Sequence, residues 1–373
     1  MSLLQGLRSQ WNNVKFFRSL FPLRSLARGA VSLPVDYLSP TGRAAAPMVL
    51  NLLLTSRCNL KCNMCSASEF RGRRYPEMSA GDVERLARSV AAFRPTFYFG
   101  GGEPFVRDDI LDLIEAVKRH DLRLGMVTNG MLFTPDRGRR AKELGLDHVL
   151  ISLHGPEPIH DAITGTPGAF RRVTENIAEF CRAPRRTTVI LNFVLSRDNL
   201  DHLFELIELG RRLGVDRVRI EHLLFMTGEE QRTHAEWCAA HLPETLAEAS
   251  HASTLICQMA AVAGFREDLP RLLEEVRRRY GSFVFIKPAL SSREVHAWYS
   301  AGYRSTRRCL FVWRALFVDP EGFVIPCQHY AGLKFGHALR EPLLEVWNSP
   351  RYREFRREIR RGLWPACARC CKL

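Results

Sequence analysis

The strongest constraint on the fold is an alternation of short apolar segments with longer amphipathic ones. Apolar segments that suit buried strands occupy residues 48–55, 96–104, 122–130, 148–155, 187–196 and 215–224. Amphipathic segments separate them, such as residues 79–93, whose apolar side chains recur at helical spacing after the potential N-cap Ser79. Strands that alternate with crossover helices predict a parallel sheet. Six such units predict an α/β fold built as a partial, TIM-like (β/α)6 barrel.

The cysteines point to metal or redox chemistry. No apolar run approaches the ~18 residues of a membrane-spanning helix. The N-terminal segment is broken by charged and polar residues, unlike a secretory signal. We therefore predict a cytoplasmic protein, in which the eleven cysteines remain reduced and clustered thiols bind metal or react.

Three of these thiols, those of Cys58, Cys62 and Cys65, follow directly after the first predicted strand. A structural zinc site needs four ligands, and no histidine lies in this loop. Thiolates suit an iron–sulfur cluster, and a cubane held by three of them keeps one iron open. The glycine-rich segment 100–104 follows the second strand. Because ligands gather at the carboxyl ends of parallel strands, we expect the two loops to lie together.

Together, these features resemble the radical S-adenosylmethionine (SAM) superfamily. The resemblance rests on the Cys58-x3-Cys62-x2-Cys65 loop, the Gly-Gly-Glu-Pro motif and the β/α pattern, over residues 48 to about 225. It implies a 4Fe–4S cluster whose open iron binds SAM, reductive cleavage to a 5′-deoxyadenosyl radical, and abstraction of a substrate hydrogen. Two positions depart from the family pattern: Met64 replaces an aromatic residue that packs on adenine, and Gly100 replaces Thr or Ser.

The resemblance also implies which residues contact SAM. Flexible glycines let the backbone approach the amino group, and Glu103 offers an acceptor for the ammonium. Ser152 lies where the family often contacts the ribose. The full set of expected SAM contacts is Met64, Gly101, Gly102, Glu103, Pro104, Ser152, Asn192, Ser196 and the backbone near His222 and Leu223.

A second cysteine group lies in residues 309–373. Residues 318–325 predict a β-hairpin that brings Cys309 and Cys327 together, and the "CARCC" segment supplies further thiols. This module resembles the SPASM/twitch extension of radical SAM enzymes. We predict one auxiliary 4Fe–4S cluster on Cys309, Cys327, Cys367 and Cys370, with Cys371 spare or replacing its neighbour. The sequence ends three residues after Cys370, which leaves no second auxiliary site. Zinc on the same four ligands is the alternative.

These predictions divide the chain into four parts. Residues 1–46 form a basic, partly amphipathic leader and residues 47–225 the barrel. Residues 226–300 form a mostly helical connection with one strand near residues 282–289, and residues 301–373 a small hairpin and helix domain for the auxiliary cluster.

A fully ligated auxiliary cluster can accept or relay an electron, which favours oxidation of a substrate radical. We therefore expect dehydrogenation or bond formation on a small metabolite or a lipid or sugar precursor, with flavodoxin or ferredoxin as electron donor. One alternative is a peptide-modifying maturase or epimerase, in which Cys238 or Cys257 would return a hydrogen atom. Another is a non-catalytic iron–sulfur carrier.

The net charge of +14 raises the question of nucleic acid. No aromatic-interleaved RNA-binding motif or zinc-finger spacing supports that partner, so the basic residues read as solvated faces. Residues 1–46 carry six Arg or Lys residues against Asp36 alone. Residues 11–31 predict an amphipathic helix, interrupted at Pro22, that lies on a membrane surface or on a partner.

Overall fold

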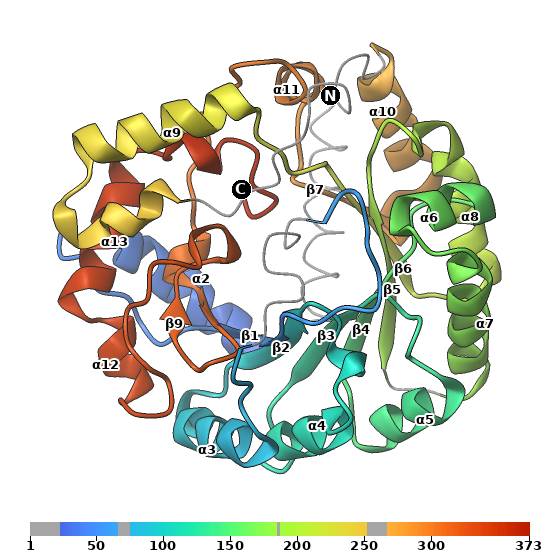
Figure 1. Ribbon diagram of the computed structural model, residues 1–373, viewed down its shortest axis with the longest axis horizontal. Helices are drawn as coiled ribbons and strands as arrows, with labels where there is room; N and C mark the ends of the chain where they lie inside the picture. Colours follow the sequence, from blue (N-terminus) through green and yellow to red (C-terminus); the bar gives the residue numbers. More distant parts are fainter. Residues whose placement is uncertain (1–22, 66–74, 185–186, 252–266) are drawn as a thin grey trace.

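A curved sheet of nine strands organises the protein (Figure 1). The computed structural model describes residues 23–65, 75–184, 187–251 and 267–373. The strand order is β7-β6-β5-β4-β3-β2-β1-β8-β9, and every neighbouring pair is parallel except β8 and β9. The strands are β1 (Val49–Thr55), β2 (Thr96–Gly101), β3 (Leu124–Thr128), β4 (His148–Ser152), β5 (Thr188–Val194), β6 (Arg217–Glu221), β7 (Val284–Lys287), β8 (Ala315–Val318) and β9 (Val324–Ile325).

Helices cover the outer side of this sheet, as Figure 1 shows for α3, α4, α5, α7 and α8. The helices around the strands are α3 (Ala80–Val90), α4 (Ile110–Lys118), α5 (Pro135–Glu143), α6 (Glu157–Thr164), α7 (Ala169–Arg182), α8 (Leu203–Arg212) and α10 (Leu269–Tyr280). The remaining helices are α2 (Leu23–Leu38), α9 (Gly228–His241), α11 (Ser292–Trp298), α12 (Leu343–Trp347) and α13 (Pro350–Arg361). No helix in the described ranges combines the length and apolar character needed to cross a membrane.

The six predicted strands are confirmed. They form because apolar side chains on their outer side pack under the helices. On β1, Leu50, Leu52 and Leu54 are buried in the main core. A second, small apolar cluster around Leu150 and Ile190 joins side chains from five strands, with Tyr98, Val127 and Phe285 packed against it. Polar groups buried in this cluster would have no water to bind. Polar side chains that bind a ligand or react are therefore expected above or below this apolar layer of the barrel.

Short sequence signals also predicted the start of α3 and the position of the hairpin correctly. Ser79 caps α3 in a reciprocal capping box, in which Ser79 Oγ accepts from the backbone N–H of Asp82 at 3.2 Å. The Asp82 carboxylate in turn accepts from the Ser79 N–H at 2.9 Å. The predicted hairpin is also present, with Val318 opposite Val324.

Two further strands extend the sheet beyond the six predicted units. β7 pairs with β6, so that Glu221 lies opposite Lys287, and β8 pairs with β1, so that Val49 lies opposite Ala315. The sheet therefore runs through residues that the sequence assigns to the connection and to the C-terminal domain. Among the described strands the order is linear, with β7 at one edge and β9 at the other.

Candidate functional site

The first cysteine group lies in the loop that follows β1. Cys58, Cys62 and Cys65 are all partly buried and unpaired by disulfides. The loop is fixed to the end of α6, because the N–H of Lys61 donates to the Thr164 carbonyl at 3.1 Å. A second bond joins the Asn63 N–H to the α6 carbonyl of Ile163 at 3.0 Å. The backbone thus holds the loop at the carboxyl end of the strand.

The predicted Gly-Gly-Glu-Pro loop packs directly on this cysteine loop. The N–H of Gly102 donates to the Thr55 carbonyl at 2.8 Å, and that of Glu103 to the Arg57 carbonyl at 2.9 Å. A Cβ on Gly102 would overlap the Arg57 carbonyl oxygen, and Gly101 has a positive φ of 109°. Glycine is therefore required here for backbone contact as well as for any approach of a ligand.

Glu103 is buried and connects three loops. Its carboxylate accepts from the N–H of Phe105 at 3.0 Å, the hydroxyl of Thr128 at 2.7 Å and the N–H of Asn129 at 2.6 Å. Burial raises the pKa of Glu103 to about 7, although these hydrogen bonds oppose the rise. The Asn129 side chain in turn donates to Cys58 Sγ at 3.8 Å. Glu103 thus orients a neighbour of the first cysteine, and its contact with SAM stays a prediction.

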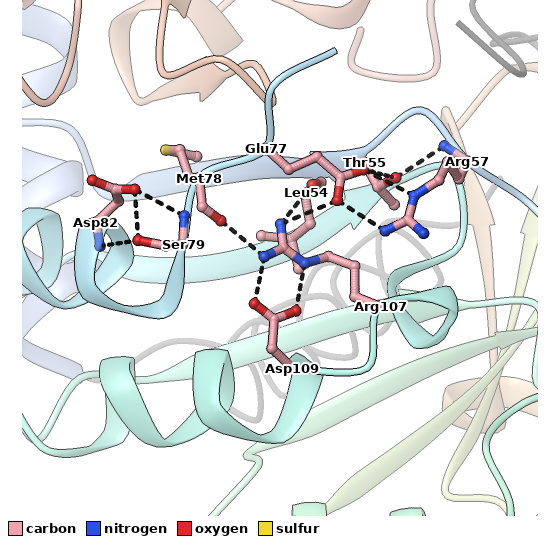
Figure 2. A network of polar contacts seen from close by, with 9 residues as sticks. All are labelled: Leu54, Thr55, Arg57, Glu77, Met78, Ser79, Asp82, Arg107 and Asp109. Atoms are coloured by element: carbon pink, nitrogen blue, oxygen red, sulfur yellow. Dashed lines mark hydrogen bonds and ion pairs between the residues drawn. The ribbon is translucent and has the colours of Figure 1, made fainter. Parts of the chain in front are cut away.

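A buried arginine that the sequence analysis did not single out fastens both ends of the cysteine loop (Figure 2). Arg107 pairs with the Asp109 carboxylate at 2.8 and 2.6 Å. It also donates to the carbonyls of Leu54 before the loop, at 3.1 Å, and of Met78 after it, at 2.9 Å. The signal that could have revealed it is the Arg-x-Asp triplet that follows the glycine motif closely.

Glu77 forms the second half of the network in Figure 2. Its carboxylate accepts from Thr55 Oγ1 at 2.5 Å and from Arg57 Nε and Nη2 at 3.1 and 2.9 Å. Thr55 and Arg57 stand immediately before Cys58, and Glu77 lies on the returning chain. Ion pairs and hydrogen bonds therefore set the width of the loop base.

The other predicted SAM contacts occupy neighbouring strand ends. Ser152 lies opposite Asn192, and Asn192 lies opposite Arg219, across β4, β5 and β6. Ser196 follows β5, and its buried Oγ has no hydrogen-bond partner within the described ranges. An unpaired buried hydroxyl is compatible with a ligand contact.

The remaining four positions differ in their surroundings. The Leu223 carbonyl already accepts from Trp298 Nε1 at 2.9 Å, and His222 Nδ1 lies 2.9 Å from the Tyr299 hydroxyl. Met64 packs against the edge of the main core, and Pro104 opens the 3-10 turn η3 (Pro104–Val106). These assignments stay predictions.

A charged row lies at the same level on β6 and β7. Arg219 Nε donates to Asn192 Oδ1 at 2.7 Å, and its Nη2 pairs with Glu221 at 3.0 Å. Burial lowers the pKa of the adjacent Lys287 to about 8. Although burial alone would raise it, Arg219, Lys287 and Lys372 lower the pKa of Glu221. Three cations, Arg219, Lys287 and Lys372, lie near this one carboxylate and leave a net positive charge.

The structure brings the predicted auxiliary cysteines together. Cys309 and Cys327 flank the β8–β9 hairpin, and burial together with the neighbouring thiols of Cys370 and Cys309 raises the pKa of Cys327. Burial, Cys327 and Cys309 likewise raise the pKa of Cys367, whose Sγ lies 3.4 Å from the Tyr330 hydroxyl. Neighbouring buried thiols with raised pKa values do not ionise easily on their own. A metal cluster binds them as thiolates, so this group suits a shared cluster.

The "CARCC" segment is anchored to residues that follow β6 and β7 in the chain. Arg369 is buried and donates twice to Glu230 on α9, at 2.9 Å each, and to the carbonyls of Trp298 and Ser300 at 2.6 Å. A hydrogen bond with Cys370, burial and the carboxylate of Glu221 raise the pKa of Cys371. Cys371 therefore faces the ends of β6 and β7. Figure 1 shows the C-terminus on the inner side of the ring of elements.

Of the two predicted hydrogen donors, Cys238 and Cys257, the structure describes Cys238. Cys238 is buried on α9, with its Sγ 3.6 Å from the His234 ring, and burial raises its pKa to about 12. It lies beyond Tyr330, on the auxiliary side. Cys257 lies outside the described residues.

Both cysteine groups consist of thiols, which are the usual ligands of iron–sulfur clusters. Within the described ranges, no three His, Cys, Asp or Glu side chains form a group arranged to hold one metal ion. A cubane instead takes each thiolate on a different iron, so its ligands stand farther apart.

Two family descriptions match the chain. The radical SAM superfamily matches residues 52–210, and the SPASM family, an iron–sulfur cluster-binding domain, matches residues 309–371. The two matched segments contain both cysteine groups.

Similar proteins cover most of the chain. An AdoMet-dependent heme synthase of Nitratidesulfovibrio vulgaris is 28% identical over 81% of this chain and 79% of that protein. A PqqA peptide cyclase of Ruegeria pomeroyi is 29% identical over 83% of this chain and 76% of that protein. Among solved structures, Streptococcus suis SuiB bound to S-adenosylmethionine matches with a TM-score of 0.62 and 18% identity, over 86% of this chain and 70% of that one. This last likeness concerns the fold.

Proposed function

We propose, because the chain belongs to the radical SAM superfamily and carries a SPASM-type iron–sulfur domain, that it uses SAM to oxidise a peptide substrate. When bound, the clusters and SAM supply one-electron cleavage of the C5′–S bond to methionine and a 5′-deoxyadenosyl radical, hydrogen-atom abstraction, and loss of one electron and a proton from the substrate radical. The observation that carries the proposal is that two separate cysteine groups border one barrel.

The chain's own residues would hold and shield this chemistry. Cys58, Cys62 and Cys65 would bind the first cluster through three thiolates and leave one iron for SAM. The Glu103–Asn129 pair would orient the Cys58 sulfur through the 3.8 Å contact. Hydrogen bonds to cluster sulfurs are one of the means by which proteins set reduction potential.

The auxiliary cluster would be held by Cys309, Cys327, Cys367 and Cys370. Cys370 is favoured over Cys371 as the fourth ligand, because the Cys370 thiol raises the pKa of Cys327 whereas Cys371 interacts with Glu221. Full ligation leaves no iron free for the substrate, so this cluster would act as electron acceptor or relay. Flavodoxin or ferredoxin would reduce the first cluster.

The net positive charge at Arg219 and Lys287 favours a substrate that carries a carboxylate. A peptide is supported by the PqqA peptide cyclase relatives, and SuiB, which shares the fold, has also been solved bound to the precursor peptide SuiA. The small metabolite favoured by the sequence remains the second candidate, because the heme synthase relatives are equally similar and the same charges would bind any carboxylate.

The decisive experiment separates this enzyme from an iron–sulfur carrier. The protein is reconstituted anaerobically and assayed for iron and for 5′-deoxyadenosine after addition of dithionite and SAM. We expect about eight irons per chain and steady formation of 5′-deoxyadenosine. Replacing the three loop cysteines with alanine should abolish cleavage, and absence of cleavage in the intact protein would leave only a carrier. Incubation with acidic peptides or carboxylated tetrapyrroles then identifies the substrate by its mass change.

A further inference from the structure

Helix α2 exposes an apolar stripe to solvent. Five large hydrophobic side chains in the described part of the chain are strongly exposed, and four belong to this helix: Leu23 at 60%, Val31 at 74%, Val35 at 67% and Leu38 at 74%. Ala27, Ala30 and Pro34 are exposed between them. Every exposed side chain that the structure describes on α2 is therefore apolar, at intervals of three or four residues that place them along one side.

The opposite side of α2 packs firmly against the protein. Ser25 is buried, and a Cβ on Gly29 would overlap the Met48 side chain. Tyr37 packs on Trp313 with ring centroids 5.0 Å apart, and Asp36 accepts from the Ala45 N–H at 2.9 Å. The helix is thus held in place with its apolar side outward.

Arginines surround the C-terminal end of this helix. Arg360 donates to the carbonyls of Tyr37, Leu38 and Ser39 at 3.2, 3.2 and 2.5 Å. Arg353 donates to the Thr41 carbonyl at 3.0 Å, and Arg308 to the Tyr37 hydroxyl at 3.0 Å. They offset the negative end of the helix dipole and place fixed cations beside the apolar stripe.

The acidic residues nearby are engaged elsewhere. Glu354 accepts from Thr245, and Glu358 pairs with Arg361. Residues 1–22, which precede the helix in sequence, add three basic residues and no acidic one. Helices α2 and α13 together carry eight arginines against Asp36, Glu354 and Glu358, so the formal charge of these two helices is +5.

We propose that α2 binds the surface of an anionic lipid bilayer, with its apolar stripe in the headgroup boundary and the arginines on lipid phosphates. An amphipathic helix of this kind lies in the interface, and basic residues beside it add attraction to negatively charged leaflets. The two signals reinforce each other, because neither weak burial nor charge alone gives stable attachment. This binding is independent of SAM cleavage.

The test is co-sedimentation of the full-length holoenzyme with vesicles of phosphatidylcholine, with or without phosphatidylglycerol. We expect binding to the anionic vesicles that falls about tenfold or more when salt rises from about 0.1 to about 0.5 M. The double variant Val31→Glu/Val35→Glu should lose about tenfold or more of this binding. The matched control Ala239→Glu/Ala240→Glu changes two exposed positions on α9 and should bind like the wild type.

Equal iron content, equal melting temperature and equal 5′-deoxyadenosine formation in detergent-free solution show that the variants fold. Failure of the wild type to bind anionic vesicles would overturn the proposal. So would equal binding by the Val31→Glu/Val35→Glu variant. A wild-type dimer that this variant converts to a monomer would instead assign the stripe to a second copy of the chain, and altered proteolysis within residues 1–22 without vesicle binding would assign it to that segment.

Discussion

Replacing Arg107 with methionine tests whether the network in Figure 2 holds the first cluster in place. The change removes two hydrogen bonds to buried backbone carbonyls, at 3.1 and 2.9 Å, the ion pair with Asp109 and a longer contact of 3.8 Å with Glu77. Each orphaned carbonyl costs about 1–3 kcal/mol. The Asp109 side chain is 39% exposed, so water can solvate it and the lost pair adds only about 1 kcal/mol. We expect the free energy of unfolding to fall by about 3–7 kcal/mol in all.

The loss should concentrate in the cysteine loop, because both carbonyls belong to its base. After anaerobic reconstitution, Arg107→Met should therefore hold about four irons per chain instead of about eight, with the auxiliary cluster retained. Formation of 5′-deoxyadenosine should fall about tenfold or more. Arg107→Lys keeps the charge but cannot span the same fork, so it should recover only part of the iron.

The matched control is Arg119→Met, because Arg119 is 57% exposed and, within the described residues, pairs with surface carboxylates on α3 and α4. It should change stability by less than about 0.5 kcal/mol. The reasoning is refuted if Arg107→Met unfolds within about 0.5 kcal/mol of the wild type while retaining all its iron.

Four further changes test other parts of the protein. Gly102→Ala places a Cβ against the Arg57 carbonyl, so SAM affinity measured by calorimetry should fall and stability should drop by about 1–3 kcal/mol. Cys309→Ala should reduce iron to about four per chain yet still release 5′-deoxyadenosine, while mass spectrometry finds no oxidised product. Burial lowers the pKa of His148 to about 3, so the unfolded imidazole binds a proton first as pH falls below about 6.5 and stability is lost toward pH 3. In urea titrations, His148→Leu should flatten this slope by up to about 1.4 kcal/mol per pH unit. Lys287→Met should raise KM for a carboxylate substrate by about tenfold or more, with Lys287→Arg closer to wild type, and an unchanged KM would remove Lys287 from the substrate site.

Features that depend on neighbours in sequence could be predicted. Ser79 and Asp82 form a capping box because a helix start leaves N–H groups that side chains three residues apart can satisfy. The parallel direction of the six strands followed from the alternating segments, since a helical crossover returns the chain to the sheet in the same direction. The same rule placed the cysteine loop beside the glycine motif.

Features that depend on residues far apart in the sequence could not be predicted. Asn51 lies opposite Phe317, and no periodic signal in either strand identifies the other. Arg107 and Arg369 each satisfy backbone carbonyls from remote segments, and such bonds leave no pattern in the sequence of the partner. Both side chains are buried arginines with an acidic partner, a type of residue that only tertiary structure distinguishes from a surface cation.

The auxiliary cysteines lie where the hairpin meets the C-terminal segment, and this has a mechanical consequence. Cys309 and Cys327 flank the β8–β9 hairpin, whereas Cys367 and Cys370 belong to a segment that contacts Tyr330 after β9 and is fastened by Arg369 to Glu230 on α9. A cluster bound to all four thiolates would therefore tie the hairpin to the C-terminal segment. Because metal binding free energy adds to folding free energy, loss of that cluster should loosen the barrel as well as remove an electron acceptor. The unfolding free energy of Cys309→Ala must therefore be measured beside its rate of SAM cleavage. A slower rate is assigned to electron transfer only where the loss of stability does not account for it.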